Sequence, residues 1–175
     1  MLTTSGTTKQ DDRCQSVVMI TLAFWLSGSV IIDVIIMPGL AAAGMTTQPG
    51  FASAGYLLFE VFNHLELLCG ALVLTGLLVL SSHQESPQGI VHEKIKSKRS
   101  IILSGILLAI SLIYTYILTP EMSGWGLQLN LFEPVTSLSG KMIQMQYSYW
   151  LLEIGKLVAG TLILLEYKQQ KSLHL

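Results

Sequence analysis

The stretch "AGYLLFEVFNHLELLCGALVLTGLLVL", residues 54–80, decides the fold of this chain. It is almost wholly apolar, and a helix needs about 20 such residues to cross the roughly 30 Å hydrocarbon core of a bilayer. Lipid cannot satisfy the polar groups of an extended backbone, so the stretch is predicted to be a transmembrane helix. Its unusual feature is a polar cluster of Glu60, Asn63, His64 and Glu66 within seven positions.

Three further segments, residues 17–43, 101–119 and 147–167, have the same apolar character. Over the 175 residues, 51% are hydrophobic and 12% are charged, against about 25% charged residues in a typical soluble domain. The sequence therefore predicts an all-α integral membrane protein. A four-helix bundle would occupy residues 17–167, between polar tails at 1–16 and 168–175.

The first segment has one alternative, a cleavable signal peptide, because basic residues precede it and "LAAAG" resembles a cleavage site. Its apolar stretch is longer than the usual 7–15 residues and contains Asp33, which favours a membrane span. Pro38 is expected to kink or end this helix, and Pro120 to close the third. Tyr149 falls where an interfacial aromatic belt is expected.

Basic residues are distributed unevenly between the two sides of the predicted bundle. Eight lie in the two tails and the loop between the second and third segments: Lys9, Arg13, Lys94, Lys96, Lys98, Arg99, Lys168 and Lys171. The two remaining loops, residues 44–53 and 120–146, contain Lys141 alone. Short loops rich in Lys and Arg stay in the cytoplasm, so both termini are predicted to be cytoplasmic.

Polar residues inside the four segments are predicted to form one layer in the non-cytoplasmic half of the membrane, judged from a helical rise of about 1.5 Å per residue. This candidate network consists of Asp33, Glu60, Asn63, His64, Glu66, Tyr114, Glu153 and Lys156. Within the second segment, Glu60, Asn63 and His64 have i, i+3, i+4 spacing and are expected to share a face, with Glu66 turned away.

The acids of this network outnumber its cations. Lys156 is the only basic residue within the segments, whereas Asp33, Glu60, Glu66 and Glu153 are all acidic. A charged side chain at mid-membrane costs about 2.5–3.5 kcal/mol even on insertion scales. We therefore expect Lys156 to pair with one or two carboxylates, and at least one other acid to be protonated near neutral pH.

Three interpretations of the network are open. It can be a structural network that fixes helix register, a proton or ion pathway, or a metal site built from Asp33, Glu60, His64 and Glu153. No recognised metal-ligand spacing accompanies the third. His64 is the only histidine in the segments, which excludes two axial haem ligands from one chain, and no catalytic motif appears. The sequence thus favours a non-enzymatic protein without a cofactor, and its net charge of −1 gives no sign of nucleic-acid binding.

Two features concern partners. The 27-residue loop at 120–146 is long for a bundle, and it is the candidate surface for a membrane-protein partner. Small residues at Gly28 and Gly160 allow close helix contact, either within the chain or in a homo-oligomer. Weak echoes between Leu26-Ser27-Gly28 and residues 103–105, and between Leu65-Glu66 and residues 152–153, are consistent with a parallel internal duplication.

Four stretches resemble a known family: "FWLSGSVIIDVIIMPGL", "PGFASAGYLLFEVFNHLELLCGALVLTG", "TPEMSGWGLQLNLFEP" and "YWLLEIGKLVAGTLIL". Together they are similar to the small four-helix bacterial membrane proteins grouped as domain of unknown function 4149, which are related to transmembrane protein 205. The resemblance covers most of residues 20–165 and implies the four-span topology but no activity. Members often have a histidine before the last helix, where this chain has Gln144, Met145 and Gln146.

The favoured function is therefore that of an accessory or assembly component in a bacterial plasma membrane or internal, thylakoid-type membrane. The alternative is a small proton- or ion-coupled transporter that uses Asp33, Glu60, His64, Glu153 and Lys156.

Overall fold

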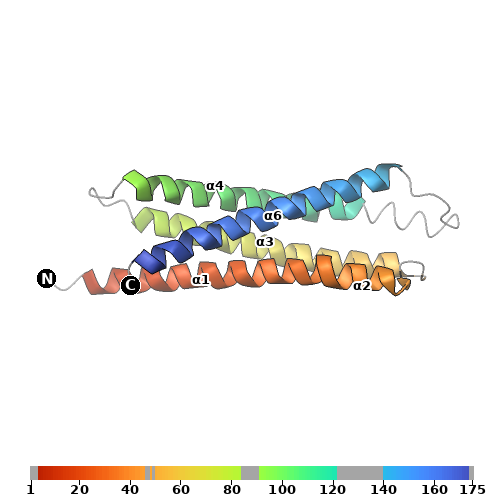
Figure 1. The fold of residues 1–175 in the computed structure, drawn as a ribbon, viewed down its shortest axis with the longest axis horizontal. Helices are drawn as coiled ribbons and strands as arrows, with labels where there is room; N and C mark the ends of the chain where they lie inside the picture. Colours follow the sequence, from red (N-terminus) through yellow and green to blue (C-terminus); the bar gives the residue numbers. More distant parts are fainter. Residues whose placement is uncertain (1–3, 46–47, 49, 84–90, 122–139, 174–175) are drawn as a thin grey trace.

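The protein consists of four long helical rods packed side by side (Figure 1). The computed structural model describes residues 4–45, 48, 50–83, 91–121 and 140–173. In chain order the elements are α1 (Thr4–Val30), η1 (Ile31–Ile36) and α2 (Met37–Ala42) in the first rod, α3 (Phe51–His83) in the second, α4 (Val91–Ile113) and η3 (Tyr114–Leu118) in the third, and α6 (Gly140–Leu173) in the fourth.

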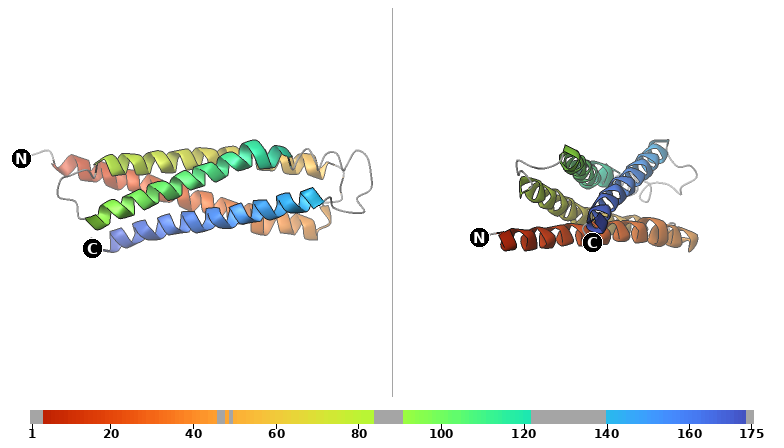
Figure 2. Two further views of the ribbon diagram at one scale, coloured as in Figure 1. Left: turned by 90° about the horizontal axis from the view of Figure 1, so that it is seen from above. Right: turned by 60° about the vertical axis from the view of Figure 1, so that its left-hand side comes forward.

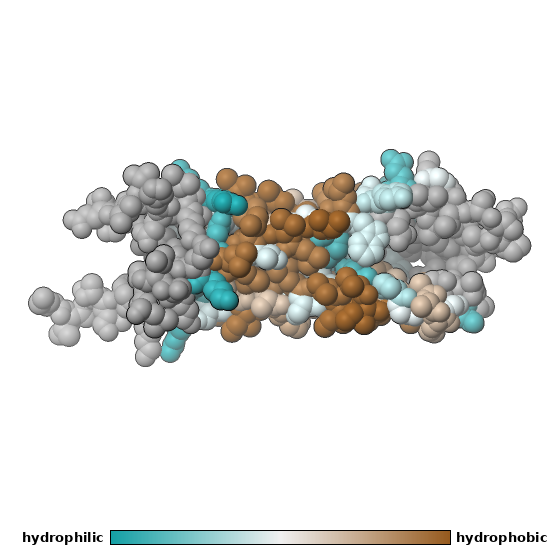
Figure 3. Space-filling model, in the orientation of Figure 1, coloured by the Kyte–Doolittle hydropathy of each residue, from teal (hydrophilic) through white to brown (hydrophobic). Residues whose placement is uncertain are grey.

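Each rod contains a helix that is long and apolar enough to cross a membrane. The candidate spans are Arg13–Ala42, Ser53–Ser82, Lys98–Glu121 and Tyr147–Lys168. The prediction of an all-α protein with four such helices is confirmed. Hydrophobic residues dominate the described surface between the two ends of the bundle, as expected where side chains face lipid (Figure 3).

The helices are longer than hydropathy predicted. The predicted polar tail at 1–16 is helical from Thr4 onward, the tail at 168–175 is helical up to Leu173, and α6 begins at Gly140, seven residues before the predicted span. A helix satisfies its own backbone hydrogen bonds in water as well as in lipid, so hydropathy locates the membrane boundary and not the end of a helix.

Each rod packs against the next one along the chain, and α6 closes the arrangement against α1 (Figure 2). The start of α1 and the end of α6 lie at one end of the bundle, which we call the proximal end. The opposite end, where α2 ends and α3 begins, we call the distal end (Figure 1).

Two π-helical turns, η1 and η3, interrupt the first and third rods near the distal end. The Met37 N–H donates to Ile32 O, and the Thr119 N–H donates to Tyr114 O, each five residues back. A proline follows in both cases. Proline has no N–H and clashes with the carbonyl four residues before it, and a wider turn relieves that clash. Pro38 was expected to kink or end its helix, and the rod instead continues to Ala42.

The apolar core fills the proximal half of the bundle. Its centre has one fully buried residue from each rod: Leu22, Val73, Leu107 and Ile163, all with 0% exposure. Small residues allow the rods to approach closely, because a Cβ added at Gly160 would lie 2.8 Å from Leu26 Cδ2. The close contact predicted for Gly160 is therefore made within the chain.

A buried charge network between the four rods

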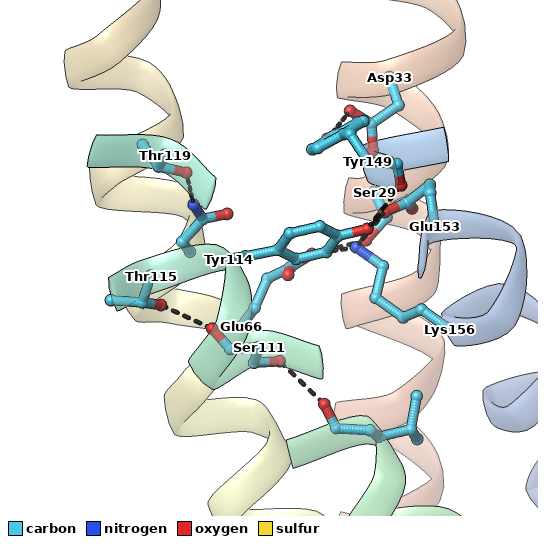
Figure 4. A network of polar contacts seen from close by, with 12 residues as sticks. Ser29, Asp33, Glu66, Ser111, Tyr114, Thr115, Thr119, Tyr149, Glu153 and Lys156 are labelled. Atoms are coloured by element: carbon cyan, nitrogen blue, oxygen red, sulfur yellow. Dashed lines mark hydrogen bonds and ion pairs between the residues drawn. The ribbon is translucent and has the colours of Figure 1, made fainter. Parts of the chain in front are cut away.

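Charged residues from the first, second and fourth rods meet a tyrosine from the third rod, distal to the apolar core (Figure 4). Asp33 comes from η1, Glu66 from α3, Tyr114 from η3, and Glu153 and Lys156 from α6. None of the five is more than 3% exposed. We call these five residues the charge network. Burial of so many ionisable groups is unusual for any protein and requires that they satisfy one another.

Lys156 is the centre of the charge network. Its Nζ lies 2.5 Å from Glu66 Oε1 and 2.7 Å from Glu153 Oε2, and 5.2 Å from the centroid of the Tyr114 ring. The prediction that Lys156 pairs with one or two carboxylates is confirmed. Because Glu66 lies on α3 and Lys156 on α6, the ion pair links two rods that are not neighbours along the chain.

Hydroxyl groups donate to the carboxylates from the surrounding helices. Ser29 Oγ donates to Glu66 Oε1 at 2.9 Å, and the Tyr149 hydroxyl donates to Asp33 Oδ1. The Tyr114 hydroxyl oxygen lies 3.2 Å from Glu153 Oε2 and 3.1 Å from the backbone oxygen of Tyr149 (Figure 4). A tyrosine hydroxyl has one proton, so at any moment it donates to one of these two acceptors.

Sequence reasoning missed two of these donors. Ser29 lies four residues before Asp33, and Tyr149 lies four residues before Glu153, so each shares a helical face with an acid of the network. That spacing was the available signal. Tyr149 was instead predicted as an interfacial belt residue, because its distance from the end of the span suits that role equally well.

Several buried polar atoms have no hydrogen-bond partner among the described residues. They are Trp25 Nε1, Asp33 Oδ2, Glu66 Oε2 and Glu153 Oε1. The carboxyl groups of Asp33 and Glu153 also lie within hydrogen-bonding reach of each other. One oxygen of each carboxyl group in the network thus accepts from a donor and the other does not.

The charge network occupies the middle and distal part of the candidate spans. Glu66 is 13 residues from Ser53 and 16 from Ser82, which places it about 20 Å and about 24 Å along the helix from those ends. Lys156 is 9 residues from Tyr147 and 12 from Lys168. Neither group can reach water along its own helix, so their charges must be balanced inside the bundle.

The predicted face of α3 was wrong. Glu60, Asn63 and His64 were expected to share the buried face, with Glu66 turned away, yet Asn63 and Glu66 are buried, His64 is exposed and Glu60 is half-buried. The buried face continues through Val73 and Leu77 with a spacing of three and four residues. Glu66 belongs to that series, whereas His64 lies on the opposite side of the helix.

The remaining predicted members of the network lie elsewhere. His64 Nδ1 donates to Glu60 O at 2.7 Å, and within the described part of the chain the Glu60 carboxylate makes no ion pair. Asn63 Nδ2 donates to Thr119 Oγ1 at 2.6 Å and so joins α3 to the third rod beside the charge network. Glu60 and His64 therefore belong to the outward side of α3.

The four candidate metal ligands are not brought together. Asp33 and Glu153 are buried in the charge network, while His64 is exposed on α3. Over the described ranges, no group of three or more His, Cys, Asp or Glu side chains is placed to hold a metal ion.

A second ion pair lies at the proximal end and differs in its environment. Arg99 Nε lies 3.3 Å from Glu166 Oε1, and Ser100 Oγ donates to Glu166 Oε2 at 2.7 Å. The Arg99 side chain is 59% exposed. This pair joins α4 to α6 near water, so it needs no balance of the kind that the charge network requires.

These features define an all-α protein with four candidate membrane-spanning helices and a charge network buried between them. Comparison of the chain with protein-family models, with curated proteins and with solved structures gives no match. The resemblance to domain of unknown function 4149 accordingly stays a prediction.

Proposed function

We propose that this protein is a non-enzymatic membrane protein that acts as an accessory or assembly component and binds a membrane-protein partner. We also propose that it belongs to the domain of unknown function 4149 family, on the resemblance described above. Its membrane would be a bacterial plasma membrane or an internal, thylakoid-type membrane. Both termini would be cytoplasmic, since nine basic residues lie outside the apolar segments predicted at 17–43, 54–80, 101–119 and 147–167, and eight of these lie in the tails and the second loop.

The observation that carries this proposal is the polar pair on the outward side of α3. Glu60 is half-buried and His64 is exposed, at 7 and 11 residues from Ser53 at the distal end of the span. His64 Nδ1 donates to Glu60 O, which leaves Nε2 of this exposed side chain to bond with a partner outside the bundle. Lipid offers no hydrogen bond to these groups, whereas a polar side chain on a neighbouring transmembrane helix does.

The closed charge network supports the same proposal. Its members are at most 3% exposed. A site that exchanges a substrate needs access from at least one side. A network without access is better suited to hold four helices in one register. The loop at 120–146 was the predicted partner surface, and most of it lies outside the described residues.

Photo-crosslinking in the native membrane tests the partner directly. A photoreactive residue in place of His64 should give a discrete protein adduct. The same residue in place of Ile154, which is 60% exposed on α6, should react with lipid alone. A second copy of this chain as the adduct would replace the accessory role with a homo-oligomer. Only lipid products at both positions would contradict the proposed surface.

Co-purification in mild detergent supplies the matched comparison. The double substitution Glu60→Leu with His64→Leu should release the crosslinked partner, because it removes both polar groups without removing apolar contact area. Val61→Ala with Leu65→Ala, two exposed apolar positions on the same helix, should retain it. Equal retention in both double variants would refute a role of the polar pair in partner binding.

A proton-coupled carrier is the rival function, because two acids contact Lys156 and three carboxylate oxygens of the network have no partner among the described residues. A carrier built on Lys156 should give pH-dependent flux in reconstituted vesicles, and this flux should disappear in the Lys156→Met, Glu66→Gln double variant. The accessory proposal expects no flux from the wild-type protein above empty vesicles. Any flux that depends on Lys156 would decide in favour of the carrier.

A further inference from the structure

The hydrogen-bond donors around Asp33 and Glu153 contact one oxygen of each carboxyl group. Glu153 Oε2 is next to Lys156 Nζ and the Tyr114 hydroxyl, while Asp33 Oδ1 accepts from the Tyr149 hydroxyl. Every donor therefore lies on one oxygen of each carboxyl group. The other oxygens, Glu153 Oε1 and Asp33 Oδ2, are buried without a partner in the part of the chain that the structure describes, although the two carboxyl groups are within hydrogen-bonding reach of each other.

Two ionised carboxylates cannot hydrogen-bond to each other, because both are acceptors only. A single proton changes this, since a protonated carboxyl group donates to an ionised one. It would also remove the repulsion between two buried negative charges, which otherwise adds to the cost of their burial.

The charge balance of the whole network leads to the same result. With every acid ionised, Asp33, Glu66 and Glu153 carry three negative charges against the single positive charge of Lys156. The titratable groups that face the Asp33 and Glu153 pair are Glu66 from α3, Tyr114 from η3, and Tyr149 and Lys156 from α6. Lys156 Nζ contacts both Glu66 Oε1 at 2.5 Å and Glu153 Oε2 at 2.7 Å, so its one positive charge is shared by two glutamates, and Asp33 adds a further negative charge beside Glu153.

We propose that the carboxyl groups of Asp33 and Glu153 share one proton, which makes this carboxyl pair a buried proton-binding site. The ligand is the proton itself. Lys156 and the Tyr114 hydroxyl contact Glu153 Oε2, and the Tyr149 hydroxyl donates to Asp33 Oδ1, which leaves the second oxygen of each carboxyl group for the shared proton. The site goes beyond the accessory role proposed above and does not depend on it, because a structural network and a carrier can both hold such a proton.

Infrared spectroscopy of the protein in lipid vesicles tests the site at neutral pH. The wild-type protein should show the C=O band of a protonated carboxyl group, and this band should shift on exchange into D₂O. Asp33→Asn and Glu153→Gln should each abolish the band. Glu66→Gln should leave it in place, because the proposed proton lies between Asp33 and Glu153 and not on Glu66. Tyr149→Phe should shift the band without removing it, since one donor to Asp33 Oδ1 is lost.

The Asp33→Asn variant is expected to fold, so misfolding would not explain the loss of the infrared band. Its amide can donate to Glu153 Oε1 as the shared proton would, and its charge equals that of the protonated pair. We therefore expect it to fold as the wild type does at neutral pH, as judged by circular dichroism and gel filtration. The proposal is overturned if the folded wild-type protein has no such band, or if the band survives in both Asp33→Asn and Glu153→Gln.

Unfolding measured against pH gives a second readout. If the folded state holds one proton that the unfolded state has released at neutral pH, stability falls as the pH rises. The midpoint of unfolding in detergent should then decrease between neutral and alkaline pH in the wild-type protein. In Asp33→Asn that part of the decrease should be absent. Identical pH profiles for the two proteins would contradict the shared proton, whatever partner the protein has.

Discussion

The two halves of the bundle are built from the same four rods but hold together differently. In the proximal half, Leu22, Val73, Leu107 and Ile163 meet at 0% exposure. In the distal half, the charge network occupies the equivalent central position. Lipid is as apolar as leucine, so the proximal core gains packing contacts but little hydrophobic driving force. Its apolar contacts carry no charge that a shift of the helices would leave unpaired.

The charge network differs in this respect. A rotation of α3 or α6 by one residue would separate Glu66 from Lys156 and leave both charges unpaired near the middle of the span. The difference between the halves therefore suggests a division of roles. The proximal half supplies contact area, and the distal half selects one register among many that pack comparably.

The largest loss of stability is expected when Lys156, at the centre of the charge network, is replaced. Lys156→Met leaves Glu66 and Glu153 without their cation, and loss of one partner from a buried ion pair costs about 3–5 kcal/mol. Unfolding by SDS titration in mixed micelles measures this loss. The variant Lys156→Met, Glu66→Gln, Glu153→Gln removes the unpaired charges and should recover most of it. A triple variant as unstable as the single one would show that charge balance is not the reason.

The next largest loss of stability is expected when a core side chain of the proximal half is truncated. Leu107→Ala removes a fully buried side chain where all four rods meet, and such truncations cost about 2–5 kcal/mol. Leu112→Ala on the same helix is the control, because Leu112 is 42% exposed and should change stability by less than about 0.5 kcal/mol. Similar losses for the two variants in the same SDS titration would mean that the proximal core is not packed as described.

A substitution at Gly160 tests the packing of the proximal half by adding a methyl group instead of removing one. A Cβ at this position would lie 2.8 Å from Leu26 Cδ2 and 2.9 Å from Leu26 Cδ1. Leu26 is 8% exposed, so it has little room to move, and Gly160→Ala should cost about 1–3 kcal/mol. Gly105→Ala meets nothing within 4 Å and should stabilise its helix by up to about 1 kcal/mol. Thermal unfolding in one detergent compares the signs, and equal signs would refute the close contact.

The sequence predicted the rods better than it predicted their faces. Hydropathy located all four candidate spans, and charge counting over the four segments predicted the pairing of Lys156, because both depend on composition and not on how each helix is rotated. Which residues of α3 face inward depends on the rotation of the helix within the bundle. His64 was assigned to the wrong side for this reason, since three polar residues at helical spacing outweighed the apolar series that continues through Val73 and Leu77.

The π turns were a further feature beyond sequence reasoning. Pro38 was expected to kink or end its helix and Pro120 to close the third, and each follows a wide turn that contains a network residue, Asp33 or Tyr114. A proline signals that the regular hydrogen-bond series is interrupted, but not which adjustment relieves it. Neighbouring rods decide that, so the outcome is a property of the tertiary structure.

The smallest effect should come from the proximal ion pair, which completes the comparison. Arg99 and Glu166 are separated by 3.3 Å, farther than the 2.5 Å between Lys156 and Glu66, and the Arg99 side chain is 59% exposed against 1% for Lys156. Water screens such a pair, and its long side chain loses entropy on pairing, so exposed pairs contribute about 0–1 kcal/mol. Arg99→Ala should therefore lower stability by no more than about 1 kcal/mol in the SDS titration, and added salt should reduce the difference from wild type further. A loss as large as that of Lys156→Met would mean that burial does not separate the two ion pairs, and the contrast between the halves of the bundle would need another explanation.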